Sequence, residues 1–168
     1  MTEQEFRAAL PRLLQWVRWT LDLHKQRARP VHSLGFNRLP DFYRAEILAG
    51  AKAVAVQRVP VPPLSALGLS RFAAFERMRM SGITYLDTFF VRADQAQDES
   101  LHFHELVHVL QWRTLGAERF LWQYADGLDR FGYRRCPLEI AAFELQARFN
   151  AARQPFDVEA EVRRCLGQ

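Results

Sequence analysis

The feature that most constrains the fold is the run from Asp98 to Gly116, which is rich in apolar residues after its first turn and yet carries His102, His104, Glu105 and His108 there. Asp98, Glu99 and Ser100 are typical of a first helical turn, where side-chain oxygens and negative charge stabilise free backbone N–H groups. Gly116 is a natural helix end. The sequence therefore predicts a helix over residues 98–115 that is buried on most sides. Ionisable groups in such a helix need polar partners or a metal ion.

Two of these histidines have the spacing of a metal site. His104 and His108 are four residues apart, so they lie one above the other on the same face of a helix. Two such imidazoles can bind one zinc ion, and Glu105 can act as general base for water activated by the metal. His102 falls on another face, where packing is expected. The alternative is a pair of core histidines bonded to carbonyl groups, with Glu105 in a salt bridge.

A catalytic zinc site needs a third protein ligand. No histidine follows His108, so a carboxylate on a second helix is expected. The apolar segment 136–144 holds two isolated acids, Glu139 and Glu144, which are five residues apart and cannot face the same way. Glu139 is favoured, because Ala142 on the same face permits close helix packing, and Glu144 is the reserve candidate. The alternative role of Glu139 is to stabilise its own first helical turn.

A tyrosine is a further candidate for the catalytic group. A phenolic hydroxyl can stabilise the oxyanion that forms when water attacks a peptide carbonyl. Tyr133 lies in the predicted loop 130–135, ahead of Glu139, and is better placed for this role than Tyr124. The alternative is that both rings simply pack.

The run His104-Glu105-Leu106-Val107-His108, followed by a glutamate on a later helix, resembles the gluzincin-type zinc metallopeptidases, and in particular small bacterial zincin-like domains. The resemblance spans residues 83–150. It implies a zinc ion held by His104, His108 and Glu139, and a peptide or protein substrate. It also implies that the strand predicted at 83–91 is an edge strand beside the cleft, to which an extended substrate could add.

Composition narrows the remaining classes. The chain has 168 residues, enough for one domain, so a single zincin-like domain over residues 1–168 is expected. The net charge of +4 comes with no nucleic-acid-binding signature, and no nucleic-acid partner is expected. The acidic start does not resemble a signal peptide, and no apolar run could span a bilayer. With only two cysteines, the expected location is the cytoplasm, without membrane association. The oligomeric state stays open.

The expected fold class is α+β: a minimal zincin-like domain with a small, mostly antiparallel sheet packed on several helices, including the one with the two histidines. Hydrophobic periodicity, capping residues and Pro or Gly stops predict helices over 3–26, 41–49, 70–80, 98–115, 117–128 and 137–152, a short C-terminal helix, and strands over 52–61 and 83–91.

The expected function is that of a zinc-dependent hydrolase, most simply a metallopeptidase with Glu105 as general base. The first alternative is a zincin-like module that binds zinc, no longer cleaves, and docks a partner. The second is a structural or nucleic-acid-associated protein in which the His-Glu-x-x-His pattern is a coincidence.

Overall fold

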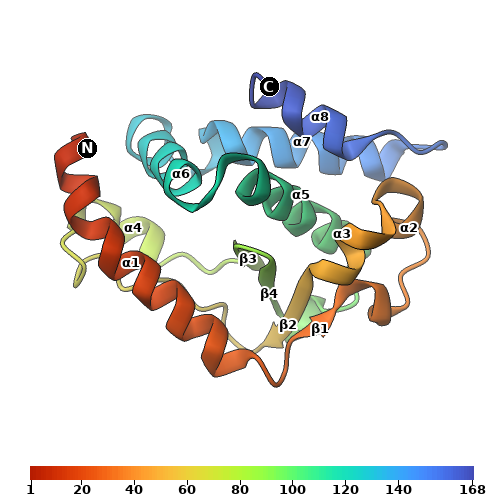
Figure 1. Ribbon diagram of the computed structural model, residues 1–168, viewed down its shortest axis with the longest axis horizontal. Coiled ribbons are helices and arrows are strands. Elements are labelled where there is room, and N and C mark those ends of the chain that lie inside the picture. Colours follow the sequence, from red (N-terminus) through yellow and green to blue (C-terminus); the bar gives the residue numbers. More distant parts are fainter.

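The computed structural model describes all residues from 1 to 168, and it has the expected α+β architecture (Figure 1). Helices and strands alternate in the first half of the chain, whereas the second half is helical. The helices are α1 (Glu3–His24), α2 (Leu39–Phe42), α3 (Ala45–Gly50), α4 (Ala73–Glu76), α5 (Glu99–Leu115), α6 (Ala117–Phe131), α7 (Pro137–Ala151) and α8 (Val158–Cys165). The strands are β1 (Arg29–Pro30), β2 (Lys52–Val56), β3 (Gly82–Tyr85) and β4 (Thr88–Arg92).

The four strands form one sheet in the order β1-β2-β4-β3. Two of its three pairings, β1 with β2 and β3 with β4, are antiparallel, while the central pairing of β2 with β4 is parallel. The sheet is therefore mixed. Strand β3 lies at an edge, next to α5.

The segment 83–91 was expected to be one strand, and this was wrong: it folds into a hairpin. Strand β3 ends at Tyr85 and β4 begins at Thr88, so two residues make the turn. Leu86 takes a left-handed conformation with φ of 58°, which a non-glycine residue rarely adopts. Two-residue hairpins usually carry glycine or asparagine at such positions, and the absence of both hid the turn from the sequence. Of these two strands only β3 lies at an edge, since β4 is internal.

Four other elements have bounds that differ from those expected. Strand β2 ends at Val56, before the prolines that were expected to end it. The helix expected over 41–49 is two short helices, because the chain is extended at Tyr43. The helix expected over 70–80 is reduced to a 3-10 turn and the single turn of α4. Helix α6 continues to Phe131, where Gly132 ends it with a positive φ.

Helix α1 shows how local signals fix an element. Thr2 caps it, since the Thr2 hydroxyl accepts from the Glu5 backbone N–H and the Glu5 carboxylate accepts from the Thr2 N–H. The helix continues through Pro11, where a break or kink was considered. Its apolar side, which includes Val17, packs against the sheet. No helix of the protein combines the length and apolar character needed to cross a membrane.

The core lies on both faces of the sheet. Along β4, Phe89 and Val91 belong to one apolar cluster with α5, α7 and α8, while Phe90 belongs to a second cluster with α1 and α6, as strand alternation requires. Residues 57–80, here called the β2–β3 segment, contribute several buried apolar side chains to the second cluster. The candidate site lies where the two clusters meet.

Candidate metal centre

Helix α5 supplies three of the chemically important side chains. Its start is fixed by Asp98, whose carboxylate accepts from the backbone N–H of Leu101 at 3.2 Å. From there to Trp112 every residue is buried. Figure 1 shows α5 running through the middle of the molecule, with α7 alongside it. The expected buried helix is thus present, and its polar groups need partners inside the protein.

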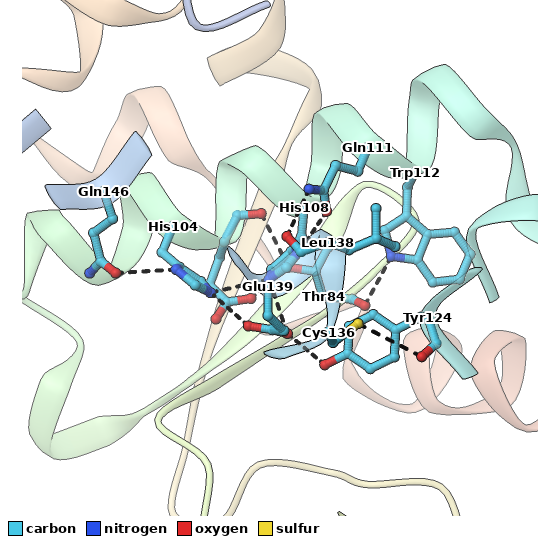
Figure 2. Close-up of polar contacts among 11 residues, drawn as sticks. Thr84, His104, His108, Gln111, Trp112, Tyr124, Cys136, Leu138, Glu139 and Gln146 are labelled. Carbon is cyan, nitrogen blue, oxygen red and sulfur yellow. Dashed lines mark hydrogen bonds and ion pairs between the residues drawn. The ribbon is translucent and has the colours of Figure 1, made fainter. Parts of the chain in front are cut away.

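The structure brings His104, His108 and Glu139 together (Figure 2). The Nε2 atoms of the two histidines are 3.1 Å apart. Nε2 of His104 lies 3.5 Å from one Glu139 oxygen, and Nε2 of His108 lies 3.4 Å from the other. Metal–ligand bonds of about 2.0–2.2 Å place neighbouring ligands of a tetrahedral zinc about 3.3–3.6 Å apart. The separations of the three donors are close to this range, and this buried group could bind one metal ion.

Glu139 stands in the first turn of α7, with its side chain directed at the two histidines. Its Oε1 accepts from the hydroxyl of Tyr124 at 2.5 Å. Its Oε2 is buried and has no hydrogen-bond partner, which is costly for a carboxylate unless a cation lies there. Glu144, the reserve candidate, is exposed and lies outside the cluster. A metal ion at this position would satisfy the orphaned oxygen.

Two glutamines orient the imidazoles. Nδ1 of His104 faces Oε1 of Gln146 at 3.1 Å, and Nδ1 of His108 faces Oε1 of Gln111 at 2.8 Å. Each amide is anchored in turn, because its Nε2 donates to a backbone carbonyl, that of Ser100 or Leu138. An amide oxygen only accepts, so each Nδ1 carries a proton and each Nε2 is left toward the cluster. Both rings are thus held in the form that ligates metal through Nε2.

Glu105 lies beside the cluster and points toward β3. Its Oε2 accepts from the hydroxyl of Thr84 at 2.7 Å. A side chain at Gly82 would not fit, since a Cβ there would lie 2.3 Å from Oε1 of Glu105. Burial raises the pKa of Glu105, against the opposing effects of His104 and His108. A carboxylate with a raised pKa beside a metal centre is suited to accept and return a proton.

The charges in the cluster are strongly coupled. Burial disfavours the charged form of His108, but the neighbouring carboxylate of Glu139 outweighs it and raises the pKa of His108 to about 9. Burial likewise raises the pKa of Glu139, yet the facing imidazoles prevail and hold it well below its usual range. The cluster thus favours a positive charge beside Glu139, whether a proton on His108 or a metal ion.

The remaining candidates take different positions. Tyr133 lines the same cavity as His104, His108 and Glu139. Burial, with the charges of Glu139 and Glu105, raises the pKa of Tyr133, so its hydroxyl is a donor at neutral pH. His102 is outside the cluster: its Nε2 lies 3.0 Å from the carbonyl of Ala96.

Sequence reasoning missed four members of the site. Gln111 and Gln146 had a signal, because Gln111 follows His108 by three residues and Gln146 follows Glu139 by seven, on the same helix faces. Thr84 and Gly82 had none, since both reach Glu105 only through the pairing of β3 with α5. Tyr124, first considered for an oxyanion, instead holds Glu139.

Comparison with known proteins adds no assignment: no family model, no curated protein and no solved structure matches this chain. The site therefore rests on its own geometry. That geometry comprises three convergent donors for a metal, one flanking carboxylate, and a tyrosine hydroxyl in the same cavity.

Proposed function

We propose that the protein is a zinc-dependent hydrolase that cleaves a peptide or a related amide. His104, His108 and Glu139 would hold the zinc, and Glu105 would be the general base. The observation that carries the proposal is Glu105 beside three donors whose spacings, 3.1 to 3.5 Å, suit one tetrahedral ion. Two nitrogen donors and one carboxylate are a common set for catalytic zinc.

A bound zinc would lower the pKa of water and polarise a carbonyl oxygen. The chain's own residues supply the rest of the chemistry. Glu105 takes a proton from the water that attacks the amide carbonyl and passes it to the departing amine, and its raised pKa favours this transfer. Thr84 fixes the direction of that carboxylate. Tyr133 donates a hydrogen bond to the negative oxygen that develops on the substrate.

The edge strand supports a place for the substrate. In the β3–β4 pairing, Gly82 faces Val91 and Thr84 faces Phe89. In this register the two residue pairs are of the non-hydrogen-bonded type. The backbone N–H and C=O groups of Gly82 and Thr84 therefore point away from β4. The carbonyl of Thr84 is already taken by the indole of Trp112 at 3.2 Å. Gly82, beside Glu105, therefore offers the backbone groups to which an extended substrate could pair.

One observation favours a second function, a zinc-binding module that docks a partner and does not cleave. His104, Glu105, His108 and Glu139 are each at most 5% exposed. A site so covered binds metal as well as an open one but admits a peptide only if part of the fold moves. We also propose a reducing location such as the cytoplasm, supported by Cys136 and Cys165, which are both free thiols.

The first test is the metal content of the purified, untagged protein by elemental mass spectrometry, beside His108→Ala. We expect close to one zinc per chain in the parent and none in the variant. The parent and Glu105→Gln are then screened against a peptide library. Turnover in the parent alone supports the hydrolase, while zinc without turnover in either supports the binding module. No metal in the parent after zinc is offered would reject both.

A further inference from the structure

An apolar cavity extends from the metal centre into the second core cluster, between α1, α6 and the β2–β3 segment. Of the 24 residues that line it, 17 are apolar or aromatic. The volume open to the centres of water molecules is about 90 Å³, which is room for several waters but not for a bulky group. The cavity is therefore narrow, and it is continuous with the site proposed above.

The histidines and carboxylates that line this cavity are gathered at one end of it. Apart from tyrosines, its polar side chains are those of the metal cluster and Glu105, with Thr84 that bonds to it. No lysine, arginine or aspartate lines it. Toward the other end the wall consists of aliphatic and aromatic groups from α1 and the β2–β3 segment, among them Leu13, Val17, Leu69 and Phe72. A charged group there would have no partner.

We propose that this cavity binds a slender, uncharged apolar chain whose polar end lies at His104, His108 and Glu139. The inference rests on the proposed function, because the polar end would be the amide group that is cleaved. The buried, unpartnered Oε2 of Glu139 points to a ligand at the polar end. The apolar wall selects what is attached to it. Part of that wall comes from α1 and the β2–β3 segment. The preference for an apolar chain therefore depends on residues outside the His-Glu-x-x-His helix.

The proposal is tested by binding, which does not require turnover. The zinc-loaded protein is titrated calorimetrically with n-alkyl hydroxamic acids, from acetohydroxamic to decanohydroxamic acid. Affinity should rise about fourfold for each added CH₂ until the cavity is full. The metal-free protein is titrated with n-alkanols from butanol to octanol, and the same trend is expected. Equal affinity across both series would overturn the proposal.

Two variants on α6 place the chain in the cavity. Ala125→Phe fills it and should weaken the long hydroxamic acids at least tenfold, with acetohydroxamic acid unchanged. Leu121→Ala widens the cavity and should raise its affinity for the long hydroxamic acids. Ala151→Phe, the same change at an exposed position on α7, is the matched control. If Ala125→Phe does not fold, Leu121→Ala and the chain-length series decide. Unchanged affinities in Leu121→Ala would count against the cavity.

The cavity and the hydrolase are rejected by different results. Binding of acetohydroxamic acid without any gain from longer chains rejects the cavity and leaves the metal site intact. Chain-length-dependent binding of alkanols without zinc binding rejects the hydrolase and supports the cavity. Competition identifies the source of the chain: N-decanoyl-glycinamide represents an acyl group, and a glycine-flanked norleucine peptide represents a side chain. Displacement by either supports the proposal, and displacement by neither overturns it.

Discussion

The two sides of the cavity are built in different ways. On one side, α5 and α7 hold the metal donors, and every donor side chain has a hydrogen-bonded partner: Gln146, Gln111 or Tyr124. On the other side, no backbone hydrogen bond joins the β2–β3 segment to the rest of the chain. That segment is held by its apolar side chains and by a few side-chain contacts.

Those contacts are few, and two of the three named here are exposed. Arg12 donates to the carbonyl of Leu67, and Arg71 donates to Asp129 at 3.1 Å. Tyr85 donates to the carbonyl of Pro60 from the sheet. Exposed ion pairs contribute little, about 0–1 kcal/mol, and segments with few hydrogen bonds to their surroundings open most readily. The donors are thus preorganised, whereas the wall facing them is held by fewer hydrogen bonds, and local opening of that wall is the route by which we expect a buried site to admit a ligand.

The largest effect should come from removing a donor on the rigid side. Glu139→Ala should lose the metal, because two imidazoles alone leave the ion without its carboxylate. At a metal concentration a thousandfold above the dissociation constant, bound metal contributes about 4 kcal/mol to stability. The melting temperature of the parent should therefore fall on chelation, and that of Glu139→Ala should not respond. Glu144→Ala, on the same helix but exposed, is the matched control, and equal metal loss in both variants would contradict the assignment.

A second large effect, a loss of hydrolysis, should follow when the Glu105 carboxylate is displaced. Gly82→Ala puts a methyl group where Oε1 of Glu105 lies, at 2.3 Å, so Glu105 must turn away. We expect metal content to be retained and hydrolysis to fall by about 10²–10⁴, the usual contribution of a general base. Turnover assays with metal analysis on the same samples measure both.

Gly50→Ala is the control for that substitution. Its new Cβ would meet only the far end of the flexible Arg113 side chain, at 2.8 Å. Normal turnover in Gly82→Ala would show that Glu105 is not the base, or that it has room to remain in place.

The sequence predicts the two sides of the cavity unequally well. The rigid side follows from local rules: His104 and His108 by helical spacing, the start of α5 by Asp98, and Glu139 as the acid on the apolar face of a second helix. The α+β class was also predicted correctly.

The other side could not be predicted, because it depends on long-range contacts. A helix was expected over residues 70–80, but Phe72 and Phe75 are placed by their fit against α1 and α6, which no helical period encodes. Strand β3 was not separated from β4, since the turn at Leu86 carries no glycine signal. Thr84 and Gly82 reach Glu105 only because that hairpin forms, so the sequence did not predict them.

A moderate effect is expected from the glutamines that orient the imidazoles. Gln111→Met removes the acceptor for Nδ1 of His108 with little change in volume, and metal affinity should fall about 10–100-fold. Gln146→Met should act in the same direction on His104, with a smaller loss because Gln146 is only half-buried. Competition with a chromophoric chelator measures both, and Gln123→Met on α6 is the control. Unchanged affinity in Gln111→Met would mean that packing alone orients the ring.

The smallest effect tests how firmly the β2–β3 segment is held. Arg71→Ala removes the contact of the β2–β3 segment with Asp129, and a loss of up to about 1 kcal/mol permits up to about fivefold more frequent opening. Stopped-flow measurement with excess chelator should show faster metal release, and mixing with zinc should show faster uptake. The dissociation constant should stay the same, because an open wall speeds both directions equally and leaves the donors untouched. Arg7→Ala removes an exposed pair within α1 that does not touch this segment, so its rates should match the parent. If Arg71→Ala combined with Arg12→Ala leaves both rates unchanged, the metal reaches its site by another path and the β2–β3 segment is as fixed as α5 and α7.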